Sequence, residues 1–526
     1  MSQIDKGIFT LDRLRQKAAT KELLWREGKG TGEIRSRFRR SGIILHISSL
    51  PSPYGIGTMG EAAKEFIDFL AAAGQSYWQV LPLSTIDHAN SPYKSYSTRA
   101  GNEFLIDIDD LREQGLLPEF SYESDADLGQ VDFCCVRELR KQWFAEAFEH
   151  FTEEHTLYSD FREFCVKEAG WLSDYALFMT IKEEYPYNWQ DWPDELKYRE
   201  VWALDAYRQS HQSRVDYYCF LQFFFFRQWQ MLKQYATSKG VAIIGDIPIY
   251  VSDDCVDVWC MPQQFLLDEE LKPISVAGCP PDYFSEDGQL WGNPLYNWDF
   301  MQSDKFTWWI ERIEFSCRLF DILRIDHFRG LESYWAVPAD SKTAREGTWC
   351  LAPGQALFDQ VYAKLGKVDI IAEDLGLITP EVNQLRRNCG FPGMKVLLFA
   401  FSPGANSDYL PHNLEEDCVL YLGTHDNNTV QGWYEEGNPA EVDFAVEYLG
   451  MHPGDNVPWR LIQVAMTSVA DNVMVQMQDY LGLGSAARMN VPGTSSGNWS
   501  WRMLPGVLTP DLACRIKRLV EISGRH

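Results

Sequence analysis

Short apolar runs recur along the chain, and polar or glycine residues end most of them. Near-continuous apolar runs of this length predict strands that are buried on both faces. Patterns with helical periodicity, such as Glu61 to Gly74, lie between several of the runs. Strand and helix alternating in this way predict an α/β fold with a parallel sheet. The runs are Ile43 to Leu50, Tyr77 to Leu83, Val241 to Tyr250, Asp321 to Phe328, Asp369 to Gly376, Lys395 to Phe401 and Val419 to Asp426. With one more strand possible near the C-terminus, they favour a closed (β/α)8 barrel over an open sheet.

The spacing of the runs also predicts how the chain is divided. We expect a lead-in over residues 1–40 and a catalytic barrel over residues 41–526. The stretch 110–239 is too long for a loop and carries helical signals such as Tyr217 to Trp229, so we expect a mainly helical insertion there. A shorter irregular region, 252–298, follows the third run and is expected to form active-site loops.

Composition narrows the class of partner. The chain carries 75 acidic and 48 basic residues for a net charge of −27, which disfavours nucleic acid and anionic membranes. Aromatic residues reach 14% of the chain, enough to fill a core and still supply stacking surfaces for a neutral ligand. We find no secretory signal after Met1 and no apolar segment of about 18 residues, so a cytoplasmic location is expected. The 12 cysteines include no C-x-x-C pair, which argues against a zinc ribbon.

The segment Gly55 to Gly60 matches the pattern G-x-G-x-x-G of dinucleotide-binding turns. Two prolines, Pro51 and Pro53, separate it from the preceding strand, where a nucleotide site needs a tight turn. The next run also lacks the acidic residue that would hold a ribose. We therefore interpret these glycines as part of a barrel loop and expect no nucleotide cofactor.

Acidic residues end four of the predicted strands: Asp246, Asp326, Glu373 and Asp426. The carboxyl ends of barrel strands meet at one face, so these side chains are expected to converge. Arg324 lies two residues before Asp326 and shares its face of the strand. Charged groups at a buried ring of strand ends indicate an active site.

Converging carboxylates serve either a divalent metal or glycoside chemistry. A guanidinium beside Asp326 would repel a cation, yet would keep that carboxylate ionised as a nucleophile. No lysine ends a strand to act as the base of a metal-dependent barrel. The residues thus favour glycoside chemistry, with a metal-dependent isomerase or lyase as the alternative.

Several motifs resemble those of the 4-α-glucanotransferases of the amylomaltase, or disproportionating enzyme, family. They occur in the family's order from about residue 40 to the end of the chain. They are SGIILHISSLPSPYGIG (41–57), SPYKSYSTRAGN (91–102), GDIPIYV (245–251), VAGCPPDYFSEDGQLWGNPLY (276–296), LRIDHFRG (323–330), IAEDLG (371–376), GMKVLLFAF (393–401), GTHDNNT (423–429) and ARMNVPGT (487–494).

The resemblance implies a (β/α)8 barrel of the α-amylase type with helical insertions, and catalysis without a metal or a cofactor. It implies that Asp326 is the nucleophile of a retaining reaction, Glu373 the acid/base and Asp426 the carboxylate that grips and distorts the sugar. The two carboxyls of such an enzyme lie about 5–5.5 Å apart. Sugar-binding roles are implied for a larger set: Tyr93, Asp246, Trp291, Arg324, His327, His425 and Asn427.

The implied substrates are α-1,4-glucans, namely maltooligosaccharides, amylose and glycogen, with glucose as an acceptor. A glucan hydrolase and a catalytically silent glucan-binding protein remain alternatives, and the oligomeric state, monomer or homodimer, stays open. The chain departs from the family at Arg99, Glu103 and Asn428, which puts its preferred donor length in doubt. We expect Trp291 to lie exposed in a loop. The aromatic-rich loop around Tyr283, Phe284, Trp291 and Tyr296 is expected to cover the active face and exclude water.

Overall fold

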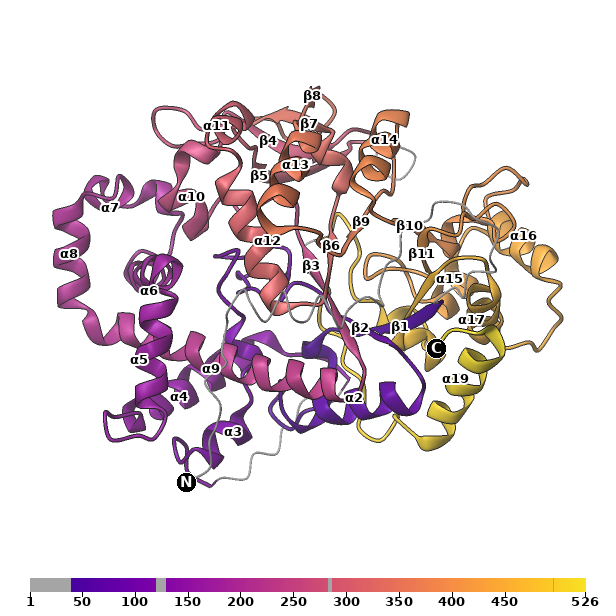
Figure 1. The fold of residues 1–526 in the computed structure, drawn as a ribbon, viewed down its shortest axis with the longest axis horizontal. Helices are drawn as coiled ribbons and strands as arrows, with labels where there is room; N and C mark the ends of the chain where they lie inside the picture. The colour runs from indigo at the N-terminus through magenta and orange to yellow at the C-terminus, as the bar shows by residue number, and fades with distance from the viewer. Residues whose placement is uncertain (1–38, 120–128, 282–285, 495) are drawn as a thin grey trace.

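Eight parallel strands close into a barrel in the computed structural model, which describes residues 39–119, 129–281, 286–494 and 496–526 (Figure 1). Around the barrel the strands follow the order β1-β12-β11-β10-β9-β6-β3-β2. This order confirms the predicted (β/α)8 fold and the eighth strand near the C-terminus. The strands are β1 (Arg40–Ile44), β2 (Tyr77–Gln79), β3 (Ala242–Ile247), β6 (Ile322–Ile325), β9 (Ile370–Ala372), β10 (Gly393–Val396), β11 (Cys418–Tyr421) and β12 (Asn472–Gln476).

The strands are shorter than the apolar runs that predicted them. They are almost wholly buried, which is why their sequences are apolar rather than alternating. The strand predicted from Lys395 to Phe401 is misplaced along the chain. Strand β10 already ends at Val396, and a 3₁₀ turn follows it at Leu397–Phe399. A buried 3₁₀ turn is as apolar as a buried strand, so the pattern could not separate them.

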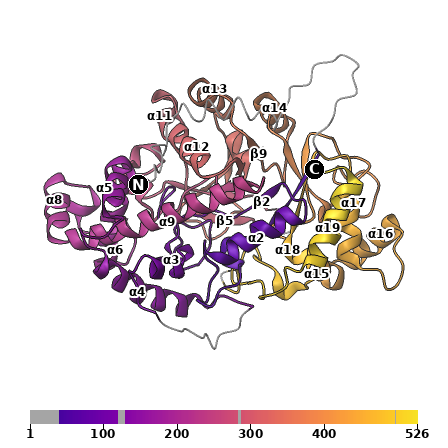
Figure 2. The same ribbon diagram turned by 60° about the horizontal axis from the view of Figure 1, so that its bottom comes forward.

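Helices cover the outside of the barrel. Helix α2 follows β1 and packs beside the C-terminal helix α19, which closes the ring (Figure 2). Both α14 and α19 begin with a threonine N-cap followed by proline and end at a glycine with positive φ. The surrounding helices are α2 (Glu61–Ala72), α9 (Gln212–Ser238), α12 (Thr307–Leu319), α13 (Gly354–Leu365), α14 (Pro380–Cys389), α15 (Val430–Glu436), α16 (Pro439–Leu449), α17 (Val457–Thr467), α18 (Met477–Tyr480) and α19 (Pro510–Ser523).

From Ile108 onward, the described part of the chain between β2 and β3 is mainly helical, and it forms one side of the molecule (Figure 1). Its helices are α3 (Ile108–Glu113), α4 (Phe133–His150), α5 (Tyr158–Lys167), α6 (Ala169–Glu184), α7 (Asp194–Lys197) and α8 (Val201–Ser210), before α9 returns to the barrel. Phenylalanines on α9, such as Phe220, Phe223 and Phe224, pack their rings against Phe151 and fix this layer to the barrel side. How the chain divides into domains stays a prediction.

The stretch 252–298 is more regular than expected. It contains α10 (Val256–Cys260), α11 (Trp298–Ser303) and two strands, β4 (Ser275–Cys279) and β5 (Gln289–Pro294). These strands join β7 (Ser333–Pro338) and β8 (Thr348–Leu351) in an antiparallel sheet of order β5-β4-β7-β8. The strands come from two separate loops of the barrel, so no local pattern could reveal their pairing. Tyr283 and Phe284 lie outside the described residues.

The glycines of the nucleotide-like pattern have a packing role. A Cβ at Gly57 would lie 2.0 Å from the carbonyl oxygen of Ile47, and one at Gly60 would lie 2.1 Å from Asp107. Real side chains do not approach that closely, so these positions need glycine. Within the described residues, no helix is both long and apolar enough to cross a membrane.

Candidate active site

Asp246, Asp326 and Glu373 lie at the carboxyl ends of three neighbouring barrel strands, β3, β6 and β9. Backbone hydrogen bonds continue past the strand ends and fix two of them. The N–H of Asp326 donates to the carbonyl of Ile247, and that of Glu373 donates to the carbonyl of Ile325. The predicted convergence of these carboxylates is therefore built into the barrel.

Arg324 joins two of the carboxylates. Its Nη1 donates to both oxygens of Asp246 at 2.8 and 2.6 Å, and its Nη2 donates to Oδ1 of Asp326 at 2.8 Å. The side chains of Arg324 and Asp246 are 4% and 0% exposed, whereas that of Asp326 is 30% exposed. Asp246 thus balances the buried guanidinium, while Asp326 remains open to a ligand. Burial raises the pKa of Asp246, and the Arg324 charge opposes that rise.

Glu373 has the protonation behaviour of a general acid. Burial, reinforced by the negative charge of Asp326, raises its pKa from 4.5 to about 8. Its oxygens accept backbone N–H groups from His327 at 2.6 Å and Leu375 at 2.9 Å, which hold the carboxyl in place. His327 adopts the left-handed conformation (φ 49°, ψ 45°), uncommon for a non-glycine residue, and thereby turns its N–H toward Glu373.

Asp426 follows β11 in a loop, and its side chain is 45% exposed. Nδ2 of Asn490 donates to its Oδ1 at 2.6 Å. Nε2 of His425 lies 3.5 Å from the same oxygen. The sequence analysis did not assign Asn490 to the site, although it recognised the motif ARMNVPGT. The two residues are 64 positions apart, and no sequence pattern indicates a contact over that separation.

Tyr93 contacts both Asp246, on β3, and His425, in the loop after β11. Its hydroxyl donates to Oδ2 of Asp246 at 2.7 Å, and its ring stacks on that of His425 with centroids 4.9 Å apart. Trp499, another residue that the sequence did not single out, lies 5.8 Å from both rings. The rings of His425 and Trp499 are buried, so the half-buried ring of Tyr93 is the one of the three that can offer a face to a sugar.

Trp291 lies in strand β5, not in a loop, and is half-buried rather than exposed. Its ring meets the edge of His327 at a centroid distance of 4.7 Å. The expectation of exposure was wrong because Gly292 and Pro294 suggested a turn, whereas both belong to the strand. Trp291 still lies against a residue that holds Glu373, so it borders the site.

Asn427 turns its Oδ1 toward its own loop, where it accepts the backbone N–H of Thr424 at 2.9 Å. Its contact with sugar stays a prediction. Two of the three residues that depart from the family, Arg99 and Asn428, are engaged in other contacts. Arg99 pairs with Glu311 at 2.8 Å, and Asn428 donates to Ser485 at 2.9 Å.

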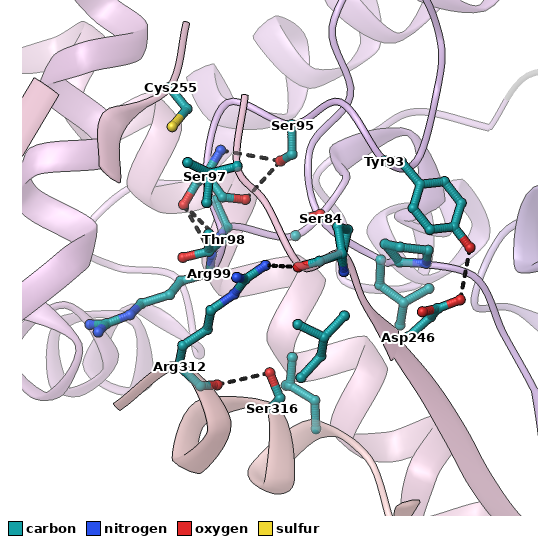
Figure 3. Close-up of a pocket in the computed structure, with 18 of the residues that line it drawn as sticks. Ser84, Tyr93, Ser95, Ser97, Thr98, Arg99, Asp246, Cys255, Arg312 and Ser316 are labelled. Atoms are coloured by element: carbon teal, nitrogen blue, oxygen red, sulfur yellow. Dashed lines mark hydrogen bonds between the residues drawn. The ribbon is translucent and has the colours of Figure 1, made fainter. Parts of the chain in front are cut away.

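A cavity of about 60 Å³ lies behind Tyr93 and Asp246 (Figure 3). Serine and threonine hydroxyls of residues 95–98 line it, together with Arg99 and Arg312. Arg312 donates to the carbonyl of Pro248, which fixes the chain just after β3. None of Asp326, Glu373 and Asp426 lines this cavity, so it supports the site from behind rather than holding the reacting atoms.

Among the described residues, no group of three or more His, Cys, Asp or Glu side chains is arranged to hold a metal ion. The arrangement offers a partly open carboxylate ion-paired with a guanidinium, a buried carboxyl of raised pKa on the next strand and the ring of Tyr93 beside them. On a (β/α)8 barrel, these features define an enzyme that acts on glycosides.

Comparisons with known proteins identify the family. The family model described as 4-alpha-glucanotransferase matches residues 45–508. The 4-alpha-glucanotransferases of Clostridium butyricum and Thermus thermophilus are each 45% identical, over 91% and 93% of this chain and 100% and 99% of theirs. The amylomaltase of Streptococcus agalactiae, solved with acarbose, matches with a TM-score of 0.90 and 40% identity over 93% of this chain and 99% of its own. The chain belongs to the 4-α-glucanotransferase family, glycoside hydrolase family 77.

Proposed function

We propose that this chain transfers segments of α-1,4-glucans to the 4-hydroxyl of another glucan or of glucose, by a retaining double displacement. The observation that carries the proposal is the pair formed by Asp326, ion-paired and partly open, and Glu373, buried with its pKa raised to about 8. Two carboxyls with opposite protonation states at neutral pH are what such a reaction needs.

In the first step, Asp326 attacks the anomeric carbon while Glu373 protonates the departing glycosidic oxygen. A covalent glycosyl-enzyme forms, and the leaving glucan departs. Glu373, now ionised, removes the proton of an incoming 4-hydroxyl, which attacks the same carbon and releases Asp326. Before the attack and again after its release, Nη2 of Arg324 stabilises the negative charge of the Asp326 carboxylate.

Asp426 is positioned by Asn490 to accept hydrogen bonds from the hydroxyls of the reacting sugar. Tyr93 supplies a ring beneath that sugar. The buried side chains of Asp246 and Arg324 support the subsite by holding Tyr93 and Asp326. We assign the same subsite to His327, His425 and Asn427. Donor chains would be maltooligosaccharides, amylose or glycogen, and the cytoplasm is the expected location.

Transfer prevails over hydrolysis only if an acceptor sugar is held in line and water is kept out. We assign Trp291, whose ring lies against that of His327, to the wall of the acceptor site. Tyr296 cannot share that role, because it is 1% exposed and part of the core.

Purified maltotriose tests the proposal. Transfer breaks one glycosidic bond for each bond it forms, so we expect glucose and a ladder of longer maltooligosaccharides while total reducing ends stay constant. Trp291→Ala should raise the hydrolysed fraction. Trp349→Ala, which changes an exposed tryptophan of β8 in the same sheet, is the matched control. Reducing ends that rise in step with maltotriose consumption would identify a hydrolase instead.

A further inference from the structure

The guanidinium of Arg324 has a third contact besides its two carboxylates. Its Nε lies 3.4 Å from Sδ of Met394, within hydrogen-bonding distance for sulfur. Met394 is on β10, which is not adjacent to β6 in the barrel, and it is fully buried. The contact therefore crosses the interior of the barrel, directly beneath the ion pairs.

A buried N–H group without an acceptor is costly, and a thioether sulfur is a weak acceptor that carries no charge. A carboxylate at this place would compete with Asp246 and Asp326 for the guanidinium. A hydrocarbon side chain would leave the Nε–H unsatisfied. Methionine satisfies the third edge of Arg324 without drawing the arginine away from Asp326.

Met394 is itself fixed through the segment that carries the acid/base. Its backbone N–H donates to Oδ1 of Asp374 at 2.7 Å, and Nε of Arg386 lies 3.0 Å from Oδ2 of the same carboxylate. Asp374 directly follows Glu373 in the chain. One residue of β10 thus contacts both the partner of the nucleophile and the neighbour of the acid/base.

We propose that Met394 is a positioning residue for the nucleophile: its thioether accepts the Nε–H of Arg324 and fixes the guanidinium plane so that Nη2 meets Asp326. This inference rests on the proposed role of Asp326. The alternative is that Met394 only fills space in the barrel core. The two roles differ in what a substitution of equal volume does to nucleophilic attack.

The test compares Met394→Leu, which keeps the volume and removes the acceptor, with Met394→Gln, which restores an acceptor oxygen at similar reach. Met474→Leu is the control, because Met474 is an equally buried methionine on β12 with no place in the proposed mechanism. Each change is made in the unmodified enzyme and in a Glu373→Gln background. In that background an α-glucosyl fluoride forms the glycosyl-enzyme without needing an acid, so mass spectrometry follows attack by Asp326 alone.

Leaving the buried Nε–H of Arg324 without its acceptor should slow adduct formation and maltotriose kcat about threefold to tenfold in Met394→Leu, with KM nearly unchanged. Met394→Gln should recover most of that loss, and Met474→Leu should leave the rate unchanged. The proposal is overturned if the rate of Met394→Leu stays within about twofold of that of its parent. It is also overturned if the rate of Met394→Gln or of Met474→Leu falls as much as that of Met394→Leu. Thermal melting of each variant shows whether it is folded. Absence of any adduct in the Glu373→Gln parent would instead refute the assignment of Asp326, and with it the role of Met394 as a positioning residue for the nucleophile.

Discussion

Raising the pH should switch off the first half of the reaction by deprotonating Glu373. Its pKa is raised to about 8 chiefly by burial, with a further contribution from the charge of Asp326, while Arg324 and two backbone N–H groups oppose the rise. The carboxyl is then about nine-tenths protonated at pH 7 and about one-tenth at pH 9. We expect kcat/KM for maltotriose to bend near pH 8 and to fall about tenfold per pH unit above it.

Two donors separate this effect from alkaline unfolding. Maltotriose needs a proton on its leaving oxygen, whereas the fluoride of an α-maltosyl fluoride leaves without one. Initial rates measured from pH 5 to pH 10 should therefore show the bend for maltotriose and a level kcat/KM for the fluoride above pH 8. The role given to Glu373 would be refuted if both donors showed a bend of equal size. It would also be refuted if kcat/KM for maltotriose already began its alkaline decrease below pH 6.

Three further changes test separate parts of the structure. Asp479 is fully buried with its pKa raised to about 7 by burial, and its Oδ1 accepts the N–H of Val430. Because that pKa lies above the unfolded value of 3.8, its contribution to stability is present in acid and is lost as the pH rises through 7. Asp479→Asn should thus stabilise the protein by about 2–4 kcal/mol at pH 9 and by little at pH 4, measured by denaturant unfolding. Asn490→Ala removes the amide donor to Asp426 and should lower kcat about tenfold or more in the maltotriose assay; unchanged kcat would show that Asp426 needs no such support. Gly101→Ala places a Cβ 2.1 Å from a phenylalanine ring of α9 and should cost about 1–3 kcal/mol in denaturant unfolding, and a loss below that range would mean that the insertion packs loosely against the barrel.

The barrel could be predicted from the sequence because its strands are buried on both faces, so each one is a nearly continuous apolar run. The same signal is weak for β12, which has only five residues, NVMVQ. The sequence therefore indicated only one possible further strand near the C-terminus. The antiparallel sheet was missed because β5 alternates between half-buried and exposed residues, and because β4 pairs with β7, which comes from a distant loop. The barrel sheet was predictable and the antiparallel sheet was not because only the barrel strands are buried on both faces.

The site was predictable where one strand sets the geometry. Arg324 and Asp326 were expected to project together from the period of two, and the 2.8 Å ion pair has that geometry. Contacts that join distant segments could not be foreseen: Asn490 reaches Asp426 across a loop, and Met394 reaches Arg324 across the barrel. Such contacts depend on the closure of the barrel, which no local pattern encodes.

The most direct test of the account is to trap the covalent intermediate. A Glu373→Gln variant fed an α-glucosyl fluoride cannot activate an acceptor, so the glycosyl-enzyme should accumulate. Intact-mass analysis should show one added glucosyl unit, and peptide mapping should place it on Asp326. The adduct should disappear when Asp326→Asn is added. An adduct that persists in the double variant, or that maps to another carboxylate, would contradict the assignment of Asp326 as the nucleophile.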